Sequence, residues 1–189
     1  MKVNGNAIRP GMILLHNDKL YKAVKIQHVK PGKGGAYAQV ELKDVISGNK
    51  LNERFRSEES VERVVLEQKA CTFSYIDGDI YMFMDNETFE QIPLATAEIP
   101  EEQLPFIKEG IVLTIEFYEE KAIGILLPPH VIQEVVETEA VIKGQTASSS
   151  YKPAMLDNGV RIMVPPHIEV GTRIVVNTES IEYVERAKD

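Results

Sequence analysis

The sequence predicts an all-β chain that folds as three small β-barrels in series. Runs in which apolar and polar residues alternate recur along the chain, and this period of two is typical of half-buried strands. Turn-forming residues such as Gly, Asn and Asp separate the runs at the short, regular spacing found in small barrels. The best helix candidate is one short segment, Pro100–Ile107. Helices are therefore expected to contribute little.

Residues 1–64 are expected to form the first barrel. Its strands are predicted at Met12–His16, Leu20–Val29, Tyr37–Val45, Lys50–Arg56 and Val61–Leu66. Strict alternation in the second of these strands places Lys25 on the same face as Tyr21 and Ala23. Lysines cluster on and around the hairpin that the second and third strands form, namely Lys22, Lys25, Lys30, Lys33 and Lys43.

The loop of that hairpin, residues 30–36, reads Lys-Pro-Gly-Lys-Gly-Gly-Ala. Pro31 fixes its own φ, and the loop glycines Gly32, Gly34 and Gly35 allow a sharp turn and a close approach to another surface. Lys33 has glycine on both sides, so no neighbouring side chain shields it. Two interpretations follow: a solvated turn with two lysines, or a lysine that enters a narrow cavity lined by phosphate or backbone, extended by covalent modification.

Residues 65–128 are expected to form the second barrel, which opens with a hairpin around Asp77-Gly78-Asp79. Its aromatic residues, Phe73, Tyr75, Tyr81 and Phe83, are interpreted as core and cross-strand packing. The other reading is a base-stacking platform, which the acidity of this segment disfavours. Further strands are predicted at Ile111–Tyr118 and Ala122–Leu127.

Residues 129–189 follow the boundary Pro128-Pro129 and form a third set of strands, about the size of an OB barrel. The strands are predicted at Val131–Glu139, Ala154–Leu156, Val160–Val164, Thr172–Asn177 and Ile181–Val184. A turn is predicted at Asp157–Gly159, and a loop of small polar residues at 143–150.

Charge is distributed unevenly over a chain whose net charge is −8. Residues 1–64 hold 12 Lys and Arg against 7 Asp and Glu, residues 65–128 hold 3 against 13, and residues 129–189 hold 6 against 9. A basic first third beside an acidic middle indicates one end that faces a polyanion. The alternative is an ordinary soluble protein with uneven charge.

The residues suggest neither an enzyme nor a membrane protein. The four histidines show no paired spacing and the one cysteine, Cys71, lies in an apolar run, so we expect no metal, no cofactor and no enzyme activity. No apolar run approaches the ~20 residues that a membrane span needs, and the N-terminus lacks a signal peptide's hydrophobic region. We expect a soluble, cytoplasmic monomer without membrane contact.

Two separated motifs resemble the bacterial elongation factor P family. The loop residues 30–36, followed by Tyr-Ala-Gln-Val-Glu-Leu-Lys43, are similar to the modification loop of that family. The stretch from Lys152 to Gly171 is similar to its C-terminal signature, and every defined position of the signature is met. The two motifs stand in the right order and spacing, so the resemblance covers essentially the whole chain.

The resemblance implies a fold and a function. The fold would be an SH3-like (KOW-like) barrel followed by two OB barrels, in an L-shaped arrangement similar in outline to a tRNA. The function would be that of a non-enzymatic factor that binds ribosomal RNA and peptidyl-tRNA and promotes peptide bonds between consecutive prolines. Lys33, extended by a lysine-modifying enzyme, would reach the peptidyl-transferase centre, with Lys30, Pro31, Gly32, Gly34 and Gly35 forming the rest of the tip.

Near the C-terminus the resemblance is weaker. Tyr183 and Arg186 match an aromatic-x-x-arginine that resembles a contact to the small ribosomal subunit, although a strand-edge pair is an equal reading. The loop at Gly144–Ser148 departs from the usual Gly-Asp-x-x-Gly form, and Ile181 stands where glycine is typical. Two alternatives therefore stay open: a paralogue with a different stall specificity, and a general single-stranded RNA-binding OB protein.

Overall fold

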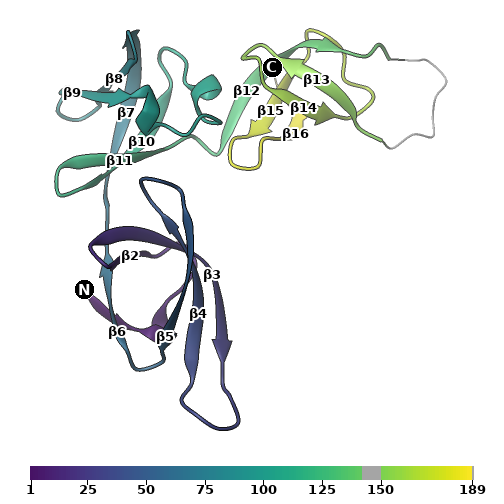
Figure 1. The fold of residues 1–189 in the computed structure, drawn as a ribbon. Helices are drawn as coiled ribbons and strands as arrows, with labels where there is room; N and C mark the ends of the chain where they lie inside the picture. The colour runs from purple at the N-terminus through teal and green to yellow at the C-terminus, as the bar shows by residue number, and fades with distance from the viewer. Residues whose placement is uncertain (142–149, 189) are drawn as a thin grey trace. The chain divides into compact units, whose positions relative to one another are not determined.

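The structure is a computed structural model that describes residues 1–141 and 150–188 (Figure 1). Its regular elements are strands and three short 3-10 turns, which confirms the all-β prediction. No helix within the described ranges is long and apolar enough to cross a membrane. The chain divides into two compact units, residues 1–69 with 115–124 and residues 70–114 with 125–189. The division into three domains at 64/65 and 128/129 and the L-shaped outline stay predictions.

The first sheet has the strand order β1–β6–β2–β3–β4–β5. Its strands are β1 (Lys2–Asn4), β2 (Ile13–His16), β3 (Lys19–Val29), β4 (Tyr37–Asp44), β5 (Lys50–Arg56) and β6 (Ser60–Val64), with a 3-10 turn η1 (Gly5–Ala7) after β1. The predicted strands are confirmed to within a few residues. Strand β1 was missed, because three residues are too few to show alternation.

One face of this sheet encloses a core. The buried cluster consists of Ile8, Leu14, Tyr21, Ala23, Ala38, Val40, Leu42, Phe55 and Val61. In β4 the buried positions alternate with less buried ones, as period-two strands require. On the other face of β4, Gln39 and Lys43 are exposed, and Tyr37 and Glu41 are half-buried.

A bulge in β3 corrects the predicted faces of that strand. Ala23 pairs with Leu42 and Lys25 pairs with Glu41, so Val24 is an extra residue in the ladder. Beyond the bulge the alternation is inverted: Ile26 packs against the core and Lys25 is exposed. The prediction that Lys25 shares a face with Tyr21 and Ala23 was wrong, because strict alternation cannot anticipate an inserted residue.

The central sheet has the order β11–β10–β7–β8–β9. Its strands are β7 (Glu67–Asp77), β8 (Ile80–Asp85), β9 (Gln91–Ala95), β10 (Val112–Tyr118) and β11 (Lys121–Leu126). Phe73 and Phe83 face each other across β7 and β8, are buried, and have ring centroids 5.5 Å apart. This confirms cross-strand packing for these two aromatic residues. Cys71 is fully buried, as expected of a small core residue.

The predicted helix at 100–107 is a turn followed by a single 3-10 turn, η3 (Leu104–Phe106), while η2 (Thr96–Glu98) precedes it. Pro105 has no N–H and disfavours the α conformation in the residue before it, so an α-helix is not sustained here. The ring of Phe106 is 1% exposed and belongs to the core of the last sheet. Lys108 also connects this segment to the last sheet. Its Nζ donates to Gln133 Oε1 at 2.9 Å and lies 3.4 Å from Asp157 Oδ2.

The last sheet has the order β14–β13–β12–β15–β16. Its strands are β12 (His130–Thr138), β13 (Lys152–Leu156), β14 (Arg161–Val164), β15 (Arg173–Asn177) and β16 (Glu182–Arg186). The outermost strands β14 and β16 contact each other, so the sheet curls around its core. The predicted strands and the turn at Asp157–Gly159 are confirmed. The loop predicted at 143–150 and its segment Gly144–Ser148 fall largely on residues 142–149, outside the described residues.

Candidate functional site

The hairpin of β3 and β4 carries the predicted loop at its free end (Figure 1). The strands pair up to Val29 opposite Tyr37, and residues 30–36 connect them. Lys30 and the segment from Pro31 to Gly35 are exposed. Among the described residues Lys33 has no hydrogen bond or ion pair. Its ammonium group is therefore available to an external partner.

Only one of the three loop glycines needs its conformational freedom. Gly34 has φ +116°, a conformation that side chains rarely adopt, whereas Gly32 and Gly35 have no atom within 4 Å of the position of an added Cβ. The reversal of the chain directly after Lys33 therefore depends on Gly34. The open space at Gly32 and Gly35 leaves the lysine unshielded.

The outer face of strands β3, β4 and β5 is basic. The pairing register aligns Lys22, Lys43 and Lys50 in one row across the three strands, and Lys25, Glu41 and Asn52 in the next. Two further rows, nearer the loop, contain Gln27, Gln39 and Arg54, and Val29, Tyr37 and Arg56. We call the exposed cations of these rows the outer basic face: Lys22, Lys25, Lys43, Lys50, Arg54 and Arg56.

Glu41 is the one acidic residue among these four rows. Its carboxylate lies 2.8 Å from Lys50 Nζ. The hydrogen bond and the charge of Lys50, followed by the charge of Lys25, hold the pKa of Glu41 below its usual value. The carboxylate therefore stays ionised and is paired, and the remaining cations face solvent. A surface of this kind attracts phosphates.

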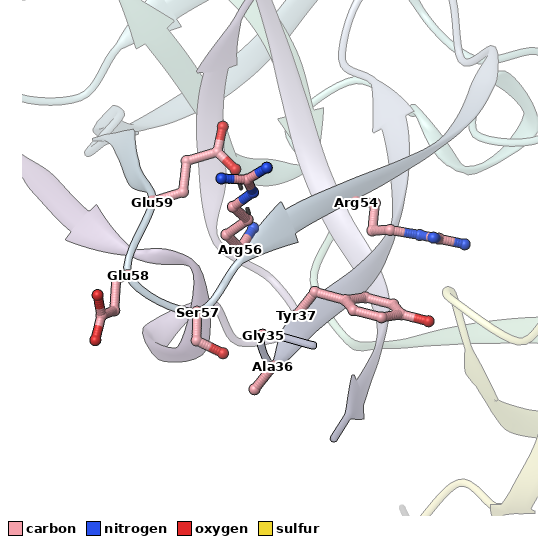
Figure 2. A pocket seen from close by; sticks show the side chains of 8 residues that line it. All are labelled: Gly35, Ala36, Tyr37, Arg54, Arg56, Ser57, Glu58 and Glu59. Atoms are coloured by element: carbon pink, nitrogen blue, oxygen red, sulfur yellow. Dashed lines mark hydrogen bonds between the residues drawn. The ribbon is translucent and has the colours of Figure 1, made fainter. Parts of the chain in front are cut away.

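An open hollow of about 1150 Å³ lies between the loop and the end of β5 (Figure 2). It is lined by Gly35–Tyr37 from the loop end, and by Arg54 and Arg56–Glu59 from β5 and the turn after it. Figure 2 shows the Arg54 guanidinium over the ring of Tyr37, with its Cζ 4.5 Å from the ring centroid. This is the distance of a cation–π contact, worth ~0.5–1 kcal/mol at an exposed site.

Sequence reasoning missed the contribution of β5 to this site. Arg54 and Arg56 belong to a strand whose alternation is visible in the sequence, with Phe55 as its buried residue. That alternation could have placed both arginines outward. Their position beside Tyr37 depends on the register of β4 with β5, which the sequence alone does not state.

The second predicted contact, Tyr183 with Arg186, is built by a bulge in β16. Tyr183 pairs with Val176 and Arg186 pairs with Ile174, so these residues share one side of the strand although they are three positions apart. Tyr183 packs against the last core and meets Tyr151 edge to face at 6.3 Å. Burial, followed by Tyr151, raises the pKa of the Tyr183 phenol, while the charge of Arg186 opposes that shift. This pair and the Lys33 loop belong to different compact units.

No group of three or more His, Cys, Asp and Glu side chains within residues 1–141 and 150–188 is arranged to hold a metal ion. The described residues of the site offer cations, an aromatic ring and the long, flexible side chain of Lys33 as chemical groups. Groups of this kind suit the binding and positioning of a polyanion.

Three family descriptions match consecutive parts of the chain. The "Elongation factor P (EF-P) KOW-like domain" matches residues 4–61, the "Elongation factor P (EF-P) OB domain" residues 66–125, and "Elongation factor P, C-terminal" residues 131–186. Elongation factor P of Roseobacter denitrificans is 56% identical over 186 residues, which is 98% of this chain and 99% of that protein. The chain belongs to the elongation factor P family.

A second relative and a solved structure support the same family. Elongation factor P of a Chelativorans species is 57% identical over 187 residues, covering 99% of this chain and 100% of that protein. Among solved structures, eukaryotic translation initiation factor 5A from Methanococcus jannaschii is similar with a TM-score of 0.53 and 25% identity, over 68% of this chain and 92% of that one. The expectation of a KOW-like barrel followed by OB barrels, drawn from two motifs, is confirmed.

Proposed function

We propose that this chain, a translation elongation factor by its family, binds the ribosome beside the peptidyl-tRNA and promotes peptide-bond formation at consecutive prolines. The observation that supports this most directly is Lys33, exposed and unpaired among the described residues, at the end of the β3–β4 hairpin. Next to it lies the outer basic face, which suits contact with RNA phosphates.

Proline is a poor and conformationally restricted reactant. A factor that holds the end of the peptidyl-tRNA in a productive pose lowers the entropic part of the barrier, while the ribosome supplies the chemistry. In this proposal Lys33 positions the peptidyl-tRNA, and peptide-bond formation on the ribosome needs no catalytic group from this chain.

How far Lys33 reaches depends on whether its side chain is modified. An unmodified lysine extends ~6 Å beyond its Cα on a flexible stem. A lysine-modifying enzyme that lengthens Lys33 would extend the tip, and the open surroundings of Gly32 and Gly35 leave room for such an enzyme. Tyr183 and Arg186 would add a contact to the small subunit through the last barrel.

Reconstituted translation of a reporter with three consecutive prolines tests this function. Protein purified from its native host is expected to relieve the stall, and Lys33→Ala to abolish relief while ribosome binding changes little. If the native protein binds ribosomes without relieving the stall, the proline assignment fails and a paralogue with another stall specificity is supported. If Lys33→Ala still relieves the stall and only weakens binding slightly, as the loss of one phosphate contact among many would, general RNA binding is supported instead.

A further inference from the structure

We propose that Arg54 and Tyr37 form a stacking subsite for one unpaired RNA nucleotide, immediately beside the Lys33 loop. This inference rests on the proposed function, because it names the part of the RNA that the hollow next to the loop accepts. The subsite is distinct from the tip itself: Tyr37 begins β4 and Arg54 lies on β5.

Arg54 and Tyr37 are held together by a cation–π contact. The Arg54 guanidinium covers the Tyr37 ring at 4.5 Å, and the side chain of Arg54 remains exposed (Figure 2). The ring of Tyr37 therefore lies on one side of the guanidinium, and the arginine stays accessible from solvent. An arginine held beside a ring in this way offers its planar group to an unpaired base, which can stack on it. Tyr37 is half-buried, so its ring is fixed by packing and can hold the arginine in place.

The space and the charge around the pair favour a nucleotide. The hollow of about 1150 Å³ that both residues line is larger than the ~300–1,000 Å³ typical of small-molecule sites, so a base and its sugar can enter. Arg56 pairs directly with Tyr37 across β4 and β5 and adds a second cation to the lining. Its side chain lies beside Glu59, whose Oε2 accepts the backbone N–H of Arg56 at 2.9 Å (Figure 2). The carboxylates of Glu58 and Glu59 repel a phosphate, so the phosphate is expected near Arg54, away from them.

The position of the pair places it beside the Lys33 loop. Lys33 lies four residues before Tyr37, and both extend from the same end of the β3–β4 hairpin. A nucleotide stacked on Arg54 would therefore be held close to the lysine. The nucleotide must be unpaired, because a base in a duplex has no free face for the guanidinium, and the unpaired end of a peptidyl-tRNA meets this condition.

The test uses the full-length native protein and ribosomes stalled at three prolines. The quantity measured is the factor concentration that gives half-maximal relief of the stall. Arg54→Ala is expected to raise it roughly tenfold, which corresponds to the loss of one stacked base. Arg54→Lys, which keeps the charge and loses the plane, is expected to match Arg54→Ala within about twofold. Tyr37→Phe keeps the ring, so its half-maximal concentration is expected to stay within about twofold of that of the unsubstituted factor. Tyr37→Leu loses the ring and is expected to raise this concentration as much as Arg54→Ala does.

Lys22→Ala is the matched control, because it removes one cation from the same face in the row farthest from the loop. It is expected to have a small effect that disappears at high salt, as for a phosphate contact. Substituting 2-aminopurine for the terminal adenine of the peptidyl-tRNA gives a direct readout. Its fluorescence is expected to fall on binding of the unsubstituted factor and to stay unchanged with Arg54→Lys.

Two kinds of result would overturn the subsite. One is an Arg54→Ala or Arg54→Lys variant that behaves like the unsubstituted factor, since the plane of the guanidinium would then not be needed. The other is a loss of Lys33 modification, measured by peptide mass, in the Arg54 variants, which would assign Arg54 to recognition by the modifying enzyme. In both cases a Lys33→Ala variant assayed in parallel reports separately on the proposed function. If Lys33→Ala is inactive while Arg54→Ala is fully active, only the subsite is rejected.

Discussion

Gly48 and Ile181 occupy the same position in two copies of one turn. The turns run from Asp44 to Asn49 and from Asn177 to Glu182, and in each the Oδ1 of the first residue accepts the N–H groups of the third and fourth residues at 2.8–3.0 Å. The fifth residue has φ +75° at Gly48 and +55° at Ile181. A third copy begins at Asp85 and has Phe89 in that position, with φ +61°.

Phe89→Gly is expected to stabilise the protein. A non-glycine residue in this conformation costs ~1–2 kcal/mol, and the Phe89 side chain is 70% exposed, so little packing is lost. The greater freedom of glycine in the unfolded chain offsets ~0.5–1 kcal/mol, leaving a gain of about 0.5–1 kcal/mol in urea unfolding. Glu87→Gly, in the same turn at an ordinary φ, is expected to destabilise instead. Equal losses for the two variants would contradict this reading.

The substitutions Ile181→Gly and Gly48→Ile are expected to change the free energy of unfolding by different amounts. The side chain of Ile181 packs against the last core, so Ile181→Gly relieves strain but loses burial, and the net change in unfolding free energy is expected to stay within about 1 kcal/mol. At Gly48 an added Cβ has only the end of Lys43 within 4 Å. Gly48→Ile therefore gains no packing and is expected to cost about 1–2 kcal/mol. Chemical denaturation of both variants compares them, and a larger loss for Ile181→Gly would overturn the expectation.

Gly5→Ala is expected to destabilise the first sheet. Gly5 is buried, its N–H donates to the carbonyl of Glu59 at 2.9 Å, and an added Cβ would overlap the carbonyl oxygen of Arg56 and lie 3.1 Å from Phe55 Cβ. Because these neighbours are backbone and Cβ atoms, they cannot rotate away. A loss of about 2–3 kcal/mol is expected by thermal or urea unfolding. Gly35→Ala is the control, since no atom lies within 4 Å of its Cβ position, and a comparable loss there would refute the steric cause.

Asp44→Asn is expected to reduce stability at neutral pH and not at low pH. The backbone N–H of Ser47, followed by that of Ile46, lowers the pKa of the Asp44 carboxyl, against burial, which raises it. A lowered folded-state pKa contributes stability above the ordinary pKa of an aspartate, and this contribution is lost as pH falls through the folded value. The variant is expected to lose about 1 kcal/mol at pH 7. Urea unfolding from pH 7 to pH 2 should show the difference shrinking, whereas a constant difference would exclude ionisation as its source.

Phe106→Ala is expected to destabilise the last barrel, although Phe106 precedes the predicted boundary at 128/129. The side chain is fully enclosed by that core, and removal of a buried phenylalanine typically costs 3–5 kcal/mol. A fragment of residues 100–189 should accordingly unfold at higher urea than one of residues 129–189. Fragments of equal stability would show that the last barrel does not depend on η3.

The sequence predicted the strands well and the faces of some of them poorly. Alternation identified nearly every strand of the first and last sheets, because one face of each is buried. It misplaced Lys25, since the bulge at Val24 shifts the register by one residue. It missed β1, which has only three residues, and β9, where Pro93 argues against a strand.

The loop was equally visible in the sequence. Residues 30–36 contain their turn chemistry and their lysines in one continuous stretch, and two motifs were enough to indicate the family. The partners of the loop were not visible, because Tyr37 and Arg54 are 17 positions apart. Only the pairing of β4 with β5 brings that ring and that guanidinium together.

Local periodicity, turn residues and contiguous motifs were enough to predict the strands, the exposed Lys33 tip and the family. The tertiary structure decided which cations share a face, how Tyr183 and Arg186 come to the same side of β16, and which residues line the hollow beside the loop. These features depend on bulges and on strand register. Both are set by the packing of residues distant in the chain, and so no local stretch of sequence specifies them.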